Sequence, residues 1–331
     1  MSRLQLGMTG LALVLLGFSL ARFVEHEGKP VTVHLAPQPA EPRVAPAEAG
    51  IDPAALDAAA GFAGAHGTRA LVVARNGHIA FEKYWGDTSF ETPVETGFDP
   101  VLVALVLGTA LNDRLMHSLD EPLANYITDL GEPQKTYTLR ELLAGDRTAI
   151  PPAESADLLA LALERVTAKP WQEVVAQRLW TPLGGGDLAF HQGDSKLRPG
   201  GVSAGCCLRA RVGDWMRVGE LLLNEGRYEG NELMPPRYAA LLTTPTHKDA
   251  PRGFFTRVDG SFADKVFWLE GSGRQRLWIV PALRLTVLRI GGEPSTGWDE
   301  AMIPDSIIRG TSGWHAPGPA QSVDPKMFAP H

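Results

Sequence analysis

Two strand–turn–strand patterns near opposite ends of the sequence constrain the fold most. The first joins an apolar strand at 69–74 to a returning strand at 78–85 through an Asn-Gly pair at 76–77. Asn-Gly favours the left-handed backbone of a two-residue hairpin. The second joins predicted strands at 276–281 and 283–288 by a tight turn. Because hairpins pair antiparallel strands, the sequence predicts a mainly antiparallel sheet.

The chain between the two hairpins is predicted to be mostly helical. An apolar run at 101–111 indicates one helix, and a second is expected around 212–223. Residues from about 112 to 251 are predicted to form a helical insertion, and 298–308 a terminal helix that packs back on the sheet. The expected fold class is therefore α/β, in the form of an α+β sandwich with helices covering the sheet.

Composition supports one large globular domain, which we place at residues 50–312. The chain has 331 residues, of which 44% are hydrophobic, with 35 glycines and 26 prolines. A chain of this length can bury a sizeable core. The remaining residues, 313–331, are polar and proline-rich and are predicted to be a tail.

The N-terminal segment is predicted to direct export. Arg3 supplies a positive end, residues 4–20 are nearly all apolar, and Ser19-Leu20-Ala21 resembles a small-x-small cleavage site. Residues 1–24 are thus a signal peptide or an uncleaved signal anchor. Residues 25–49, rich in Pro, Ala and Glu, are predicted to be an extended linker. The expected location is the periplasm, with anchoring to the inner membrane as an alternative.

The order of these elements, together with Gly108-Thr109-Ala110-Leu111 in the first long helix, resembles the serine β-lactamase and penicillin-binding-protein-like family. The likeness is to its class C and esterase-like branch and spans roughly Ile51 to Gly310. It implies a β-lactamase/transpeptidase-like fold and a serine hydrolase. Such an enzyme needs Ser-x-x-Lys as nucleophile and base, Tyr-x-Asn or Tyr-x-Ser as proton relay, and Lys-Thr-Gly or His-x-Gly beside the oxyanion hole.

The first of these motifs is missing. Alignment on Gly108 puts Gly97 at the serine and Pro100 at the lysine, and neither residue has a side chain that can act as nucleophile or base. No serine anywhere in the chain is followed three residues later by lysine. Asp99 is predicted to cap the helix and Pro100 to occupy its first position, so the helix is retained without its chemistry.

The other two motifs are degenerate as well. None of the five tyrosines is followed two residues later by Asn or Ser, and the relay loop is expected near Pro151 and Ala153. Ser272-Gly273-Arg274 is predicted to occupy the place of Lys-Thr-Gly on its strand, where Ser272 or Arg274 could still bind an anion.

A relocated nucleophile is the main alternative. Residues 201–205 match Gly-x-Ser-x-Gly, with Ser203 at the centre. The preceding residues indicate a loop and not a strand, so a glycine-rich loop leading into the helix at 212–223 is the competing interpretation. Candidate partners downstream are Asp214, Asp259 or Asp264, followed by His247 or His315.

No cofactor or metal is expected. The nine histidines lack metal-binding spacing, and no dinucleotide or phosphate-binding motif occurs. Cys206 and Cys207 are adjacent, and because neighbouring cysteines rarely bridge, they are expected to be two buried small residues. A net charge of −7 with dispersed basic residues argues against nucleic acid as a partner.

These observations favour a catalytically inactive, exported homologue of a serine hydrolase that acts as a binding or accessory protein. Its expected ligand is a small molecule or peptide in the vestigial cleft. Two alternatives stay open: an active hydrolase using Ser203, and an accessory subunit of a membrane complex.

Overall fold

A computed structural model describes residues 30–36, 38–39, 41–146, 150–192, 200–246, 252–259 and 261–316. The predicted signal peptide or anchor lies outside these residues, as does the predicted tail from residue 317 onward. Within the described residues, no helix combines the length and the hydropathy that a membrane span requires.

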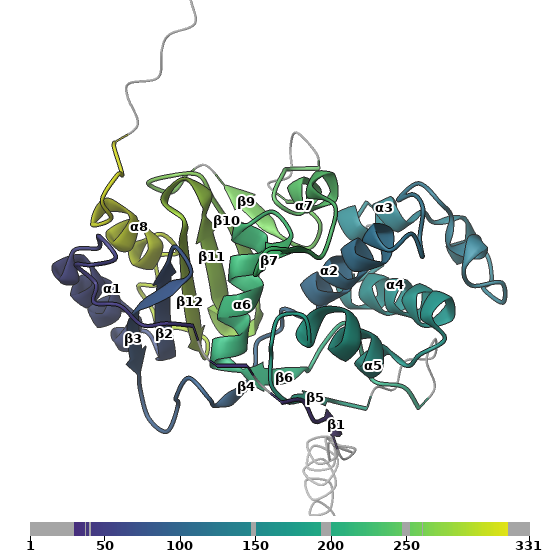
Figure 1. Cartoon of the computed structure of the whole chain (residues 1–331), viewed down its shortest axis with the longest axis horizontal. Helices are drawn as coiled ribbons and strands as arrows, with labels where there is room; N and C mark the ends of the chain where they lie inside the picture. Colours follow the sequence, from purple (N-terminus) through teal and green to yellow (C-terminus); the bar gives the residue numbers. More distant parts are fainter. Residues whose placement is uncertain are drawn as a thin grey trace, which may run out of the picture.

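The main sheet confirms the predicted antiparallel arrangement. Its strands run in the order β3-β2-β12-β11-β10-β9, and every pairing is antiparallel. Strands β2 and β12, from opposite ends of the domain, lie side by side as the second and third strands, with Val73 opposite Val287 (Figure 1). The strand bounds are β2 (Thr68–Arg75), β3 (His78–Tyr84), β9 (Arg257–Asp259), β10 (Val266–Glu270), β11 (Arg276–Val280) and β12 (Leu285–Gly291).

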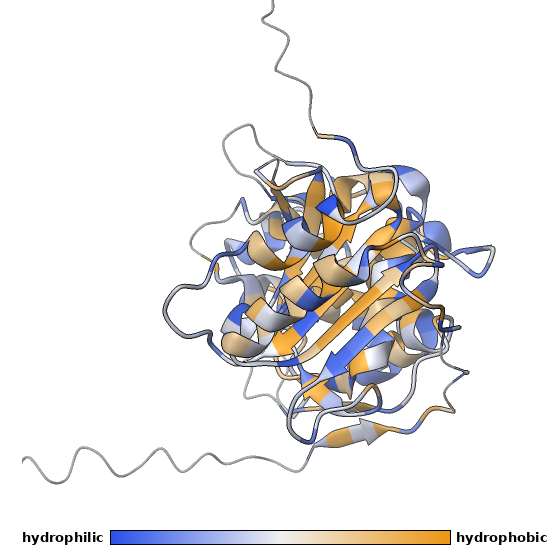
Figure 2. Ribbon diagram, turned by 90° about the vertical axis from the view of Figure 1, so that its left-hand side faces the viewer, coloured by the Kyte–Doolittle hydropathy of each residue, from blue (hydrophilic) through white to orange (hydrophobic). Residues whose placement is uncertain are grey.

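One face of the main sheet is covered by helices from the two ends of the domain. Helix α1 (Pro53–Ala65) and helix α8 (Met302–Arg309) pack against each other and bury a core with the sheet, including Leu56, Trp278 and Ile303. Figure 2 shows the apolar strands between their helical coverings. The predicted terminal helix begins later than expected, at Met302, and Trp298 lies before the helix with its ring under the Arg289 guanidinium.

Helix α6 (Val212–Leu223) covers the opposite face, where the sequence predicted a helix with the same bounds. It contacts β11 and β12. Gly219 permits this close packing, because a Cβ there would lie 3.3 Å from side-chain atoms of Leu277 and Thr286. The segment 112–251 is therefore not purely a helical insertion, because its helix α6 packs against the main sheet.

The helical lobe stands beside the sheet (Figure 1) and contains α2 (Asp99–Asn112) at its centre. Helix α3 shows how local sequence sets its bounds: Thr138 and Glu141 form a capping box, and Gly145 ends the helix with φ +73°. The other helices are α3 (Leu139–Ala144), α4 (Pro152–Thr167), α5 (Trp171–Val175), α7 (Pro236–Leu242), the π-helical turn η3 (Ala176–Trp180) and the 3₁₀ turns η1 (Leu123–Asn125), η2 (Gln134–Thr136), η4 (Ser272–Arg274) and η5 (Pro281–Leu283).

The predicted linker is docked on the domain over its described part. Strand β1 (Val31–Val33) pairs with β5 (Leu188–Phe190) in a small sheet completed by β6 (Arg209–Arg211) and β4 (Pro93–Glu95). A separate hairpin joins β7 (Arg227–Tyr228) and β8 (Asn231–Glu232).

A buried arginine holds the next part of that segment. Arg217 donates hydrogen bonds to the carbonyls of Gln38 and Pro39 and lies 3.0 Å from a carboxylate oxygen of Glu41. Burial raises the pKa of Glu41 above its usual range, against the opposing effect of a backbone hydrogen bond and of Arg217. This part of the chain is therefore a strap on the domain and not a free spacer.

Candidate functional site

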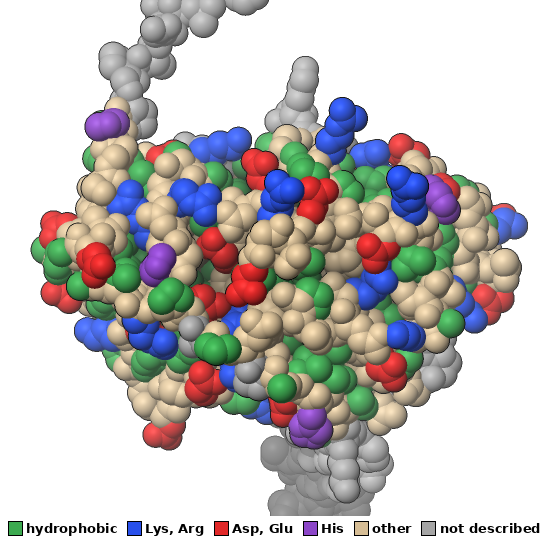
Figure 3. Space-filling model, viewed as in Figure 1, with side chains coloured by type: hydrophobic (Ala, Val, Ile, Leu, Met, Phe, Trp, Pro, Cys, Tyr) green, Lys and Arg blue, Asp and Glu red, His purple; other side chains and the backbone are tan. Residues whose placement is uncertain are grey.

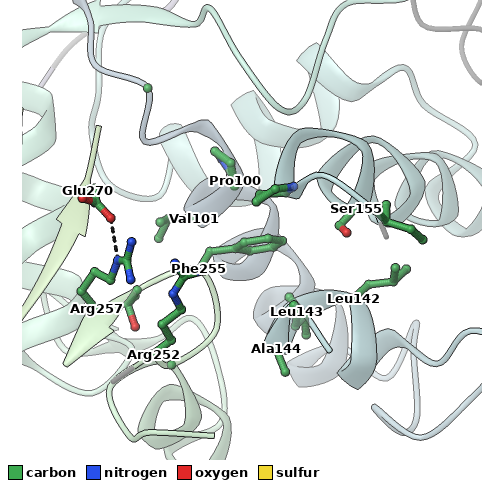
Figure 4. A pocket seen from close by; sticks show the side chains of 16 residues that line it. Pro100, Val101, Leu142, Leu143, Ala144, Ser155, Arg252, Phe255, Arg257 and Glu270 are labelled. Atoms are coloured by element: carbon green, nitrogen blue, oxygen red, sulfur yellow. Dashed lines mark hydrogen bonds and ion pairs between the residues drawn. The ribbon is translucent and has the colours of Figure 1, made fainter. Parts of the chain in front are cut away.

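A pocket of about 430 Å³ lies where the helical lobe meets the edge of the main sheet (Figure 4). It is formed by the start of α2, by α3, by the start of α4 and by the loop that leads into β9. We call it the cleft pocket. Its lining residues are Gly97, Pro100, Val101, Leu142, Leu143, Ala144, Gly145, Ile150, Pro152, Ser155, Arg252, Gly253, Phe255, Thr256, Arg257 and Glu270.

Gly97, the predicted serine position, lines this pocket. Its φ of +77° lies in the left-handed region that favours glycine. A Cβ at this position would lie 3.0 Å from the backbone nitrogen of Ser272 and 3.4 Å from the Cα of Gly271. The structure thus brings the first and third predicted motif positions together at one side of the pocket.

Pro100 lies in the first turn of α2, at the second position and not at the first as predicted, because Asp99 belongs to the helix and does not cap it. Helix α2 begins at Asp99, and the carboxylate accepts a hydrogen bond of 2.7 Å from the backbone N–H of Leu208. The residue is only 3% exposed, and its second carboxylate oxygen has no hydrogen-bond partner among the described residues. Burial raises the pKa of Asp99 to about 7.

The predicted relay positions lie near the pocket but carry no protic side chain. Pro151 precedes α4, and Pro152 lines the pocket. Ala153 lies against the loop at Gly205, where an added Cβ would come within 2.6 Å of the Ala153 Cβ. Ser155, one turn further along α4, is the hydroxyl that this wall presents to the pocket.

Ser272, Gly273 and Arg274 form the turn η4 between β10 and β11, so the expectation that they lie on a strand is wrong. The glycine required by close approach is Gly271, because a Cβ there would lie 1.9 Å from the carbonyl oxygen of Thr96. Arg274 lies 3.7 Å from Glu300 and is not among the residues that line the pocket.

Ser203 lies in a half-buried loop, and the strand-to-helix elbow that Gly-x-Ser-x-Gly would need is absent from residues 200–208. Its hydroxyl oxygen accepts a hydrogen bond from the backbone N–H of Gly205. No described histidine or carboxylate is hydrogen-bonded to Ser203. Asp214 is buried and paired with Arg211, Asp264 accepts from its neighbour Lys265, and His315 is exposed beyond α8. His247 and the Asp259 side chain lie outside the described residues.

The adjacent cysteines form a disulfide, so the expectation of two buried thiols is wrong. Cys206 and Cys207 are joined across one peptide bond, with Cys206 exposed and Cys207 half-buried. The loop that carries them is held on both sides, because Ala204 N–H donates to Asp157 on α4 and Leu208 N–H donates to Asp99 on α2. Both helices begin at the cleft pocket.

The charged residues of the pocket were not singled out from the sequence. Arg257 donates to Glu270 across 2.5 Å, and Arg276 donates to the same carboxylate across 3.1 Å. Burial alone would raise the pKa of Glu270, but the hydrogen bond from Arg257 and the nearby arginine charges outweigh burial and lower it. Arg252, exposed at the same end, adds a further positive charge.

The arrangement can bind a ligand but offers little for acyl transfer. The pocket lining contains no lysine, histidine or tyrosine among the described residues. Of its two hydroxyls, that of Thr256 donates to the Leu242 carbonyl, and no base lies beside Ser155 in the lining. The described residues contain no group of three or more His, Cys, Asp or Glu side chains suited to a metal ion.

No family model and no curated protein matches this sequence. Solved structures do match. A class C β-lactamase from Rhodobacter sphaeroides aligns with a TM-score of 0.57 and 14% identity over 78% of this chain and 99% of its own. An octameric penicillin-binding protein homologue from Pyrococcus abyssi aligns with a TM-score of 0.56 and 15% identity over 73% of each chain.

A penicillin-binding protein homologue from Caulobacter crescentus aligns at a TM-score of 0.58 and 12% identity, over 78% of this chain and 96% of its own. Likeness at such low identity speaks for shared architecture and says nothing about activity. Taken with the sheet order and the helical lobe, it confirms the predicted resemblance in its structural part: this chain has the fold of the β-lactamase and penicillin-binding-protein-like serine hydrolases.

Proposed function

We propose that this protein is a non-catalytic binding protein that uses the cleft of a serine-hydrolase fold to hold a small ligand without reacting with it. The observation that carries the proposal is Gly97. It lines the cleft pocket against the turn at Ser272, where the nucleophile would stand, and it has no side chain. A backbone in the left-handed region favours glycine there and disfavours serine.

The rest of the pocket supports the same proposal. Pro100 replaces the lysine base, and no side chain that could relay a proton stands at Pro151, Pro152 or Ala153. The lining is mainly apolar with a few charged groups at one end, which is typical of ligand-binding pockets. The missing groups would be needed together for acylation, since a serine hydroxyl is a weak nucleophile without a base.

We further propose that the protein is exported. The N-terminal sequence has the pattern of a signal peptide or anchor. The Cys206–Cys207 disulfide is in keeping with an oxidising compartment, because disulfides persist there and are rare in the cytosol. Figure 3 shows acidic and basic side chains interspersed on one face, which gives nucleic acid no basic surface there.

Covalent labelling tests the proposal. Purified protein is incubated with a fluorescent penicillin and, separately, with a fluorescent fluorophosphonate, beside an active class C β-lactamase. We expect no labelled band for this protein with either probe. Labelling that disappears in Ser203→Ala would establish the relocated nucleophile, and labelling that disappears in Ser155→Ala would establish a nucleophile in the pocket. Either result overturns the proposal.

A further inference from the structure

We propose that the cleft pocket binds a monoanionic amphiphile, namely a carboxylate that carries an apolar chain, with the carboxylate held at Arg252 and Arg257. The inference rests on the proposed function in treating the cleft as a binding site. It names the chemical class of the ligand, which neither the fold nor the lost motifs specify.

One end of the pocket has a net positive charge, which favours an anionic ligand. The charged side chains of the described lining are Arg252, Arg257 and Glu270. Glu270 is fully engaged, because Arg257 and Arg276 both donate to it. Arg276 is in turn paired with Glu300 at 2.5 Å. Within the described lining, two guanidiniums therefore face one carboxylate, which leaves one positive charge.

Arg252 is the group that supplies this charge. Arg252 makes no ion pair with any residue in the described part of the chain, although it is close enough to Glu270 to lower that carboxyl's pKa. Figure 4 shows Arg252 and Arg257 beside each other, with Glu270 joined to Arg257. The planar donor fork of a guanidinium matches a carboxylate in two parallel hydrogen bonds. A ligand with two negative charges fits less well, because one of them would face Glu270 without a counter-charge.

The opposite end of the pocket calls for an apolar group. It is walled by Leu142 and Leu143 of α3 (Figure 4), and the apolar part of the lining also includes Pro100, Val101 and Ile150. Binding at such a wall is favoured for a ligand with an apolar chain, because its methylene groups are removed from water. A strongly polar ligand would lose its hydration there and find only the Ser155 hydroxyl as a side-chain partner among the described lining residues.

Phe255 connects the two ends. Its ring extends from the arginine side towards the apolar helices (Figure 4). Its φ of +56° is uncommon for a bulky residue, and such outliers are maintained only where the surrounding structure holds them. The ring thus offers an apolar floor directly beside the two guanidiniums, as an amphiphile with an adjacent headgroup and chain requires.

Isothermal titration calorimetry with the full folded domain tests the inference. The probes are hexanoate, octanoate and decanoate, with decanol and decyltrimethylammonium as uncharged and cationic counterparts. We expect each added CH₂ to tighten binding by about fourfold until the chain outgrows the pocket. Decanoate should bind at least about tenfold more tightly than decanol, and the cation more weakly than either.

Three variants separate headgroup from chain. Arg252→Gln should weaken decanoate about tenfold and leave decanol unchanged. Arg237→Gln, on the exposed surface of α7, is the matched control and should change neither. Ala144→Trp, on α3 at the pocket wall, should abolish binding of both probes, with circular dichroism to show that the fold is retained.

The inference is overturned if decanoate does not bind, if decanol and decanoate bind equally, or if Arg252→Gln has no effect on decanoate. These outcomes are independent of the labelling experiment. Penicillin labelling of a protein that binds decanoate through Arg252 would refute the non-catalytic function alone. Absence of both labelling and decanoate binding would refute only the ligand class.

Discussion

The two sides of the cleft near Gly97 differ in how much polar structure they contain. On the sheet side, the turn Ser272–Arg274 is fastened by the buried Arg289, which donates to the carbonyls of Gly273, Arg274 and His66 and to the Thr68 hydroxyl. On the helix side, Gly97 and Pro100 contribute no functional group at all. The difference teaches that the groups holding the backbone of this cleft are separate from those that would perform catalysis, so the second set can be absent while the first preserves the shape.

The largest expected effect comes from removing Arg289. The Arg289→Met substitution removes the charged donor of several hydrogen bonds, each worth about 1.5–3 kcal/mol, so we expect a loss of roughly 4 kcal/mol or more in unfolding free energy. Urea denaturation followed by circular dichroism measures it. Arg274→Met, a half-exposed neighbour, should cost less than about 1 kcal/mol. Equal losses of unfolding free energy for the two variants would contradict the view that the buried Arg289, and not the exposed Arg274, holds the turn in place.

The second prediction concerns Asp99 on the helix side. Its pKa of about 7 in the folded protein lies well above the ordinary pKa of 3.8 for a free aspartate, because the carboxyl is buried. The folded state therefore holds more protons than the unfolded state between roughly pH 4 and pH 7, and stability falls as pH rises through this window.

Asp99→Asn should remove this dependence while keeping an acceptor for Leu208 N–H. We expect the variant to match the parent near pH 4 and to be more stable by about 4 kcal/mol at pH 8, measured by urea unfolding at both pH values. Asp57→Asn, an exposed carboxylate on α1, is the control and should leave the pH profile unchanged. A variant that is less stable than the parent at pH 8 would show that a charged Asp99 supports the cleft.

A smaller effect is expected at Gly97 itself. Gly97→Ala places a Cβ at positive φ and 3.0 Å from Ser272 N, so we expect a loss of about 1–2 kcal/mol in thermal or urea unfolding. Gly61→Ala is the matched control with the opposite sign. It lies in α1 with open space around it and should gain about 0.5–1 kcal/mol. If Gly97→Ala were also stabilising, the positive φ of the backbone would no longer explain why position 97 carries a glycine.

The smallest effect is expected at the disulfide. The stabilisation by a cross-link grows with the logarithm of the length of the loop that it closes, and adjacent cysteines close almost no loop. Reduction of Cys206–Cys207 should therefore change the unfolding free energy by less than about 1 kcal/mol. Thiol alkylation with mass spectrometry, before and after reduction, reports the state of the pair. Two free thiols in the untreated protein would contradict the bridge. A large loss of stability on reduction would instead show that this loop holds the helices α2 and α4 in place, as Arg289 holds the turn on the sheet side.

Much of the fold followed from local patterns. The hairpin at residues 68–84 and helix α6 agree with prediction nearly to the residue, because alternation and helical periodicity are properties of neighbouring residues. The cap at Asp99 was predicted wrongly for the converse reason. Its hydrogen-bond partner, Leu208, is 109 residues away, and capping rules consider only the next turn.

The strap and the pocket escaped prediction in the same way. Residues 31–33 join a sheet through backbone pairing with β5. The proline- and alanine-rich composition of this segment gives no signal for a strand. Arg252 lies in a loop and Arg257 begins the short strand β9, and only the pairing of β9 with β10 places Glu270 beside them. The misplacement of the third motif arose because one strand was assumed where the chain makes a turn between two.

The sequence by itself determined that Ser-x-x-Lys is absent, because no fold can supply a side chain that the chain lacks. It also determined the antiparallel sheet, through turn chemistry and residue alternation. Only the tertiary structure decided that Gly97 meets Ser272, that Asp99 is buried against Leu208, and that two arginines share one end of an apolar pocket. Each of these depends on contacts between distant segments, whose free energy is set by packing and desolvation and not by neighbouring residues.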